Sequence, residues 1–112
     1  MHELAITQNI LSVVLDEARA AQAKKVTRID LVIGELSGIE GDCVQFNFEY
    51  VKRGDIAEEA VLNFKIAPAQ LRCRDCQADF SPSGIWICPE CQSSRIEIVS
   101  GRDCFIESIE VD

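Results

Sequence analysis

The chain of 112 residues has the size of one small domain, and its 47 % hydrophobic and 27 % charged residues are typical of a folded globular protein. Lysine and arginine number 11 against 19 acidic residues, so the net charge of −8 disfavours binding to the phosphate backbone of a nucleic acid. The sequence shows neither a long apolar run nor a signal-peptide pattern, so we expect no membrane insertion and a cytoplasmic location. In that compartment, six cysteines favour metal ligation over disulfides.

The first predicted element is a helix from Leu4 to about Ala23. Apolar residues recur along this stretch at helical spacing, while polar residues such as Gln8 and Asp16 occupy the other side. The predicted buried stripe consists of Leu4, Ile10, Leu11, Val14, Leu15, Ala18 and Ala21.

Three later stretches alternate between apolar and polar residues and predict strands. Residues 26–34 place Ile29, Leu31 and Ile33 on one face, and residues 60–67 show the same alternation. The apolar residues of the second stretch are Leu62, Phe64 and Ile66. The final stretch, "DCFIESIEVD", places Phe105, Ile109 and Val111 on one face with Glu107 interrupting. We expect these strands to share one sheet, which makes the main domain discontinuous, with residues 1–68 and 98–112.

The stretch "GDCVQFNFEYVKRG" fits two structures. Alternating Val44, Phe46 and Phe48 fit a strand, whereas an N-cap at Asp42 and the closing Gly54 fit a helix. The residues leave both possibilities open, and the cap favours the helix.

Residues 69–97, called here the cysteine module, contain two Cys-x-x-Cys pairs. Cys73 and Cys76 form the first pair, and Cys88 and Cys91 form the second. Each pair can present two sulfurs to one ion through a tight turn, and two pairs complete a closed tetrahedral site. Such a site suits a structural Zn(II), although iron in the same cage and a redox role remain alternatives. We therefore expect an inserted module that protrudes from the main domain.

The only histidine of the chain is His2. The amine of Met1, the backbone nitrogen of His2 and its imidazole can close two fused chelate rings, with Glu3 beside them. Planar nitrogen donors favour Ni(II) or Cu(II). Cys43 and Cys104 lie in apolar segments and are interpreted as small core residues. The sequence contains no pair of nucleophile and general base that would suggest an enzyme.

Several stretches together resemble the HypA/HybF family of hydrogenase maturation factors, which are nickel metallochaperones. The resemblance covers essentially the whole length and rests on "MHELAITQNI", "IDLVIGELSGIE", "FNFEYVKRGD", "CRDC", "CPEC" and "IESIEV". It implies an α+β fold with two helices packed on a small mixed three-stranded sheet and an inserted four-cysteine zinc-ribbon module. It also implies that the ambiguous stretch is a helix.

The resemblance further implies that His2 is a nickel ligand, with the Met1 amine and Glu3 beside it, and that Cys73, Cys76, Cys88 and Cys91 hold zinc. The implied partners are a HypB-type GTPase and the large subunit of [NiFe]-hydrogenase, and some members also serve urease. The sequence leaves open whether the protein forms a homo-oligomer, including one in which the subunits exchange the cysteine module. The alternative from another class is a zinc-ribbon module that binds a protein partner and has no nickel function.

Overall fold

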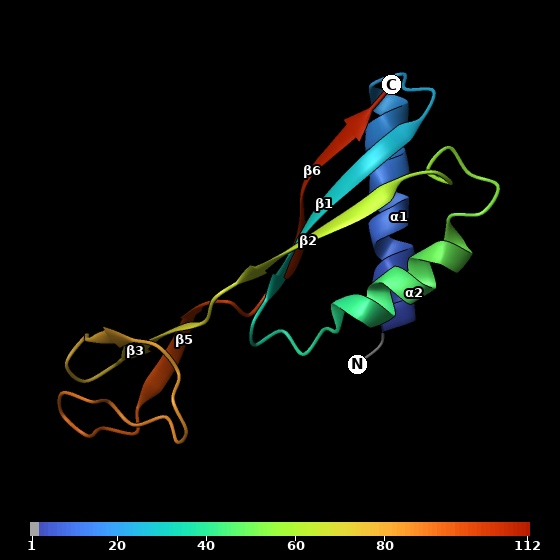
Figure 1. The fold of residues 1–112 in the computed structure, drawn as a ribbon. Helices are drawn as coiled ribbons and strands as arrows, with labels where there is room; N and C mark the ends of the chain where they lie inside the picture. Colours follow the sequence, from blue (N-terminus) through green and yellow to red (C-terminus); the bar gives the residue numbers. More distant parts are fainter. Residues whose placement is uncertain (1–2) are drawn as a thin grey trace.

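Two small sheets, joined end to end by a narrow neck, organise the computed structural model, which describes residues 3–112 (Figure 1). The elements in chain order are α1 (Glu3–Ala20), β1 (Val26–Gly34), α2 (Gly41–Val51), β2 (Val61–Ala67), β3 (Gln70–Cys73), β4 (Asp79–Phe80), β5 (Ile96–Ser100) and β6 (Cys104–Val111). The molecule is elongated, with principal extents of 55, 25 and 17 Å. The expected α+β fold is confirmed.

The main sheet has the order β2-β1-β6, with β1 parallel to β2 and antiparallel to β6. It is therefore the mixed three-stranded sheet that the resemblance implied. Both helices lie on the same side of this sheet (Figure 1). Ile29 and Leu31 of β1 face them, as alternation predicted, and pack with Val14 of α1 and Phe48 of α2 in one buried core.

The helix α1 begins at Glu3 and ends at Ala20, three residues earlier than predicted. The chain turns at Gln22, which has a φ of 55°, and the N–H of Ala23 donates to the carbonyl of Ala18 at 2.9 Å. This left-handed closing turn leaves Ala21 exposed. Leu4 is also exposed, whereas Thr7 is buried and its hydroxyl donates to the carbonyl of Glu3 at 2.6 Å.

The helix α2 confirms the helical interpretation of the ambiguous stretch, but the predicted cap is wrong. The N-cap residue is Glu40, not Asp42, and the side chain of Glu40 makes no capping hydrogen bond. Asp42 lies in the first turn, where its negative charge complements the helix dipole. Val44 and Phe48 point into the core, so the helical spacing, not the alternation, describes the buried face.

The strand β6 joins the main sheet as predicted, but Phe105 is not on the predicted face. Asp30 pairs with Ser108 and Leu31 pairs with Ile106, so Glu107 is an extra residue in β6. This bulge reverses the alternation, because one inserted residue sends every side chain beyond it to the other face. Phe105 pairs with Val32 on the face away from the helices and is about half exposed.

The second sheet has the order β4-β3-β5, and all its pairs are antiparallel. It forms the protruding end of the molecule (Figure 1). Residues 67–69 and 101–103 connect it to the main sheet and are called here the neck. The β5 strand extends to Ser100, so the sheet carries the cysteine module and the last residues before the neck.

Candidate metal centre

The two Cys-x-x-Cys pairs bring four sulfur atoms together at the far end of the second sheet. The sulfurs of Cys73, Cys76, Cys88 and Cys91 all lie within 4.8 Å of one another. Cys73 and Cys91 are 3.6 Å apart, and Cys76 and Cys88 are 3.5 Å apart. A tetrahedral ion with sulfurs at about 2.3 Å needs sulfur–sulfur distances of about 3.8 Å. The four thiols therefore already have nearly the spacing of a closed four-coordinate site.

The two pairs have the same local backbone. In the first, the N–H of Gln77 donates to the carbonyl of Cys73 at 2.9 Å; in the second, the N–H of Gln92 donates to the carbonyl of Cys88 at 2.9 Å. In each pair the sulfur of the first cysteine also accepts an N–H two residues later, from Asp75 or Glu90, at 3.4 Å. These amides would stabilise negative charge on a metal-bound thiolate.

The residue after each pair adopts a backbone conformation that is unfavourable for most side chains. Gln77 has a φ of 67° and Gln92 a φ of 60°. This left-handed step lets the chain turn away from the sulfurs while the tight turn keeps both cysteines pointing inward. The side chain of Gln77 also donates to the carbonyl of Arg74 at 3.1 Å.

Hydrogen bonds between polar side chains connect the two Cys-x-x-Cys pairs. The carboxylate of Asp75, between the cysteines of the first pair, accepts hydrogen bonds from the hydroxyl of Ser93 and from Arg95, the latter at 2.8 Å. Ser93 and Arg95 follow the second pair. The bridge fixes how the two turns face each other.

The electrostatics of the centre favour a bound cation. Hydrogen bonds from the N–H groups of Cys76 and Asp75 lower the pKa of the Cys73 thiol to about 7. Although the N–H of Ser93 acts to lower the pKa of Cys91, the neighbouring thiols and burial raise it to about 12. Without a cation, one thiolate forms easily and the others do not, because like charges repel at this distance. A central metal ion removes that repulsion.

The amino-terminal site is described only in part. Met1 and His2 lie outside the described residues, and Glu3 is the first residue of α1. The carboxylate of Glu3 accepts the N–H of Glu40 at 3.3 Å, and its carbonyl accepts the Thr7 hydroxyl. Glu3 is therefore held both by its own helix and by the residue that caps α2.

The two remaining cysteines lie away from the four-sulfur cluster, and only one of them is partly buried. Cys43 is exposed on α2, so its interpretation as a core residue is wrong. Cys104 begins β6 and is partly buried, and burial raises the pKa of its thiol. It borders an apolar groove that α1 lines with Ile6, Ile10 and Val13.

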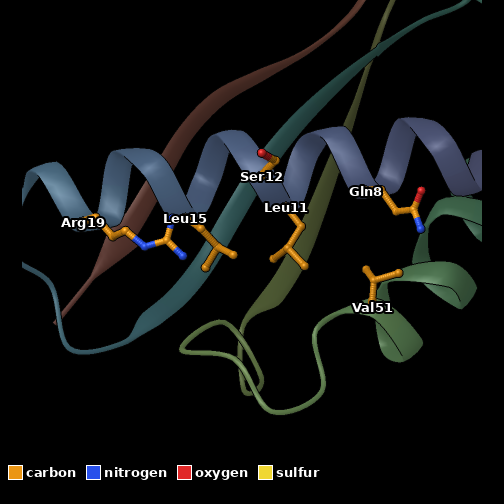
Figure 2. Close-up of a pocket in the computed structure, with 6 residues that line it drawn as sticks. All are labelled: Gln8, Leu11, Ser12, Leu15, Arg19 and Val51. Atoms are coloured by element: carbon orange, nitrogen blue, oxygen red, sulfur yellow. The ribbon is translucent and has the colours of Figure 1, made fainter.

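A second hollow lies between the two helices, away from the four-cysteine cluster on the second sheet. Figure 2 shows Leu11 and Leu15 of α1 on the side where Val51 of α2 lies, with Gln8, Ser12 and Arg19 also at the margin. Its lining has no cysteine, histidine or carboxylate. It is therefore not a candidate metal site.

Sequence reasoning missed the residues that position the centre. The left-handed glutamines carry no distinctive sequence signal, because glycine or asparagine is the usual residue at such a backbone position. The Asp75–Arg95 ion pair joins residues twenty apart along the chain. The Cys-x-x-Cys spacing alone does not predict either feature.

The fold and the centre define a class of small α+β protein that carries a four-thiolate metal centre on a protruding second sheet. The family model described as "Hydrogenase/urease nickel incorporation, metallochaperone, hypA" matches residues 1–111, and the chain belongs to this HypA family.

Related proteins agree with the family model over the full length. A Hydrogenase maturation factor HypA from Dehalococcoides mccartyi (strain CBDB1) is 47 % identical over 100 % of this chain and 95 % of its own length. Another from Caldanaerobacter subterraneus subsp. tengcongensis is 41 % identical over 100 % of both chains. The solution structure of the Ni metallochaperone HypA from Helicobacter pylori superposes with a TM-score of 0.74 at 25 % identity, covering 99 % of this chain and 97 % of that one. The chain is thus similar to hydrogenase maturation factors in both sequence and fold.

Proposed function

We propose that this chain binds Ni(II) through the Met1 amine, His2 and Glu3 and delivers it during maturation of [NiFe]-hydrogenase. The observation that carries the proposal is the match of residues 1–111 to a nickel-incorporation family, because the matched range includes this amino-terminal set. The role is that of a carrier, not of an enzyme, and its place of action is the cytoplasm.

The chemistry of the donor set supports nickel. The amine, the His2 backbone nitrogen and the imidazole form fused five- and six-membered chelate rings in one plane, which Ni(II) accepts and Zn(II) disfavours. Each nitrogen must lose or lack a proton, so binding weakens as the pH falls. A chelate of few ligands at the surface allows an acceptor's thiolates to enter before the ion leaves, which is what delivery requires.

The position of Glu3 supports a defined geometry at this site. Glu3 starts α1, whose buried face is part of the main core, and its carboxylate is bonded to Glu40. Residue 3 of the proposed donor set is therefore anchored where α1 begins.

The four-cysteine centre has a separate role in the proposal. We assign Zn(II) to Cys73, Cys76, Cys88 and Cys91 as a structural ion, because four thiolates leave no open position for exchange. Residues 69–97 then form a zinc-binding module, and residues 1–68 and 98–112 form the nickel-binding domain. The proposed partners are a HypB-type GTPase and the hydrogenase large subunit.

The test is a calorimetric titration of Ni(II) into tag-free protein whose Met1 is confirmed by mass, beside His2→Ala. One tight nickel site that His2→Ala abolishes supports the proposal. Zinc content measured in both proteins is the control, because His2→Ala should leave it at one ion per chain. Equal nickel binding by both proteins, or binding by neither, contradicts the proposed amino-terminal site.

A further inference from the structure

The four cysteines of the metal centre differ in their exposure to solvent. The first cysteine of each pair, Cys73 or Cys88, is fully buried, whereas the second, Cys76 or Cys91, is exposed. A competing ligand therefore reaches the sulfurs of Cys76 and Cys91 first. The side of the centre that carries these two sulfurs is the route by which a metal ion exchanges.

The backbone ladder between β3 and β5 ends before it reaches this exposed side. Its last strand pair joins Cys73 to Ile96, and one further bond runs from the N–H of Arg74 to the carbonyl of Arg95 at 2.8 Å. Within the described residues 3–112, no backbone hydrogen bond joins residues 75–76 to residues 89–95. The backbone alone therefore leaves the two exposed cysteines unconnected.

Side chains continue the connection where the ladder ends. One carboxylate oxygen of Asp75 accepts the hydroxyl of Ser93, and the other accepts an N–H of the Arg95 guanidinium at 2.8 Å. The hydroxyl oxygen of Ser93 also accepts the backbone N–H of Arg95 at 3.0 Å. Asp75 directly precedes Cys76, and Ser93 lies two residues after Cys91. These three residues, called here the Asp75 bridge, therefore join the two chain segments that carry the exposed sulfurs.

Arg95 also balances charge beside the centre. Four thiolates around a divalent ion leave an excess of negative charge, and the Asp75 carboxylate adds to it. The guanidinium of Arg95 offsets this addition, because like charges repel. The side chains of Asp75 and Arg95 are 40 % and 68 % exposed, so water weakens the ion pair and its effect should be moderate.

We propose that Asp75 is a positioning residue that slows metal exchange at the four-cysteine centre through its bonds to Ser93 and Arg95. The two Cys-x-x-Cys pairs must break the Asp75 bridge before they can separate on their exposed side. The proposal rests on the Zn(II) assignment of the proposed function. The bridge then determines how fast the ion leaves, and the four cysteines alone determine how it is bound.

The main experiment follows zinc transfer from the full-length protein to excess chelator. Anionic 4-(2-pyridylazo)resorcinol and neutral TPEN are used in parallel, because loss of the bridge should act whatever the charge of the chelator. Asp75→Ala should speed transfer to both chelators by about threefold to tenfold. Asp75→Asn keeps an acceptor for the Ser93 hydroxyl and should give an intermediate rate. Arg95→Ala acts through the same bridge, so adding it to Asp75→Ala should change the rate by less than about twofold.

The matched control is Asp79→Ala, which removes another carboxylate of the second sheet. Asp79 pairs with Arg72 at 2.8 Å and joins β3 to β4, not the two Cys-x-x-Cys pairs. Its rate of zinc transfer should stay within about twofold of wild type. Co(II)-substituted proteins provide the second measurement, since an unchanged tetrahedral four-thiolate spectrum in every variant shows that the ligands are intact.

Three results would overturn the proposal: a wild-type rate in Asp75→Ala, an equal acceleration in Asp79→Ala, or an acceleration seen only with the anionic chelator. If Asp75→Ala loses the tetrahedral spectrum, Ser93→Ala decides, because it removes only one hydroxyl. Its transfer should be at least about twofold faster, and no acceleration would contradict the bridge. Wild-type protein that binds no zinc would contradict the Zn(II) assignment itself, whereas bound zinc with an unaffected rate contradicts the bridge alone.

Discussion

Gln77 and Gln92 occupy left-handed backbone conformations that a side chain makes unfavourable by about 1–2 kcal/mol. Gln77→Gly removes this cost but also the exposed hydrogen bond to Arg74, so we expect unchanged or slightly higher stability of the metal-loaded protein. Gln77→Val places a β-branched residue at the same φ of 67° and should lower the free energy of unfolding by about 1–2 kcal/mol. Urea unfolding of the zinc-loaded variants measures both effects.

The control for this pair is Gln70→Val. Gln70 lies in β3, where an extended backbone accommodates valine, so this variant should lose no more than its hydrogen bond to Ser81. Equal losses of unfolding free energy in Gln70→Val and Gln77→Val would mean that the backbone conformation at residue 77 does not determine the effect of valine.

At the scale of elements, the second sheet lacks a core of its own. Among residues 70–100 only Leu71, Cys73 and Cys88 are buried. Apolar burial therefore cannot hold this sheet, and the zinc ion proposed for the four cysteines would supply the missing stability. We expect a strong chelator to unfold residues 70–100 while the main sheet and both helices stay folded. Hydrogen exchange should show fast amides at Leu71 and Ile98 and protected amides at Leu31.

Cysteine variants provide the matched comparison for metal removal. Cys73→Ser should reproduce the chelated state, whereas Cys104→Ser and Cys43→Ser should keep one metal ion and a protected second sheet, because both cysteines lie outside the cluster. Protection of residues 70–100 that survives chelation would show that the sheet is stable without metal.

The open face of the main sheet has a polar cluster around Asp30. Its carboxylate accepts hydrogen bonds from the Ser108 hydroxyl at 2.7 Å, from Arg28 at 3.1 Å and from Asn63 at 3.3 Å. The Ser108 bond, with Arg28 and Asn63, lowers the pKa of Asp30 below 3.8 despite partial desolvation. These three partners come from all three strands, so the cluster ties β2, β1 and β6 together.

A lowered folded-state pKa gives a definite pH dependence. The ionised carboxylate stabilises the fold above pH 3.8, and this contribution disappears as the pH falls through the folded-state pKa. Asp30→Asn should therefore have a lower thermal midpoint than wild type at neutral pH. The gap should close in more acidic solution, where wild type also becomes neutral at this position. A gap that is independent of pH would point to a steric effect instead.

Local sequence patterns predicted the secondary-structure elements. The features that these patterns missed depend on pairing between strands that are distant in the sequence. Alternation identified the buried face of β1 because no extra residue interrupts β1 between Ile29 and Ile33. The same rule failed at Phe105, since the bulge at Glu107 exists only through pairing with β1. For α2 the residues alone left strand and helix open, and the family resemblance decided correctly.

The same distinction between local patterns and long-range contacts applies to the candidate site. The spacing of Cys73, Cys76, Cys88 and Cys91 is a local signal, and the structure confirms that their sulfurs cluster. The hydrogen bond from the N–H of Ala69 to the carboxylate of Glu35 at the neck joins residues 34 apart in the chain, and no local pattern encodes it.

At the scale of the whole molecule, the relative placement of the two sheets depends on the close approach of backbone segments at the neck. A Cβ atom on Gly34 would lie 2.4 Å from the carbonyl oxygen of Gly101 and 2.7 Å from that of Asp103. The N–H of Gly34 donates to the same carbonyl of Asp103 at 2.8 Å. Only glycine lets the end of β1 approach both chain segments this closely.

Gly34→Ala should therefore force the neck apart and lower the free energy of unfolding by about 2 kcal/mol, because backbone atoms cannot move aside as a side chain can. Gly41→Ala is the control. The added Cβ would meet the Ile33 side chain at an ordinary 3.6 Å, and residue 41 lies in α2, where alanine is favoured. Urea unfolding compares their stability, and small-angle scattering compares the longest dimension. Gly34→Ala should change that dimension while keeping its bound metal, because the cysteines lie beyond the neck. An unchanged dimension with unchanged stability would mean that the neck tolerates displacement and does not fix the module.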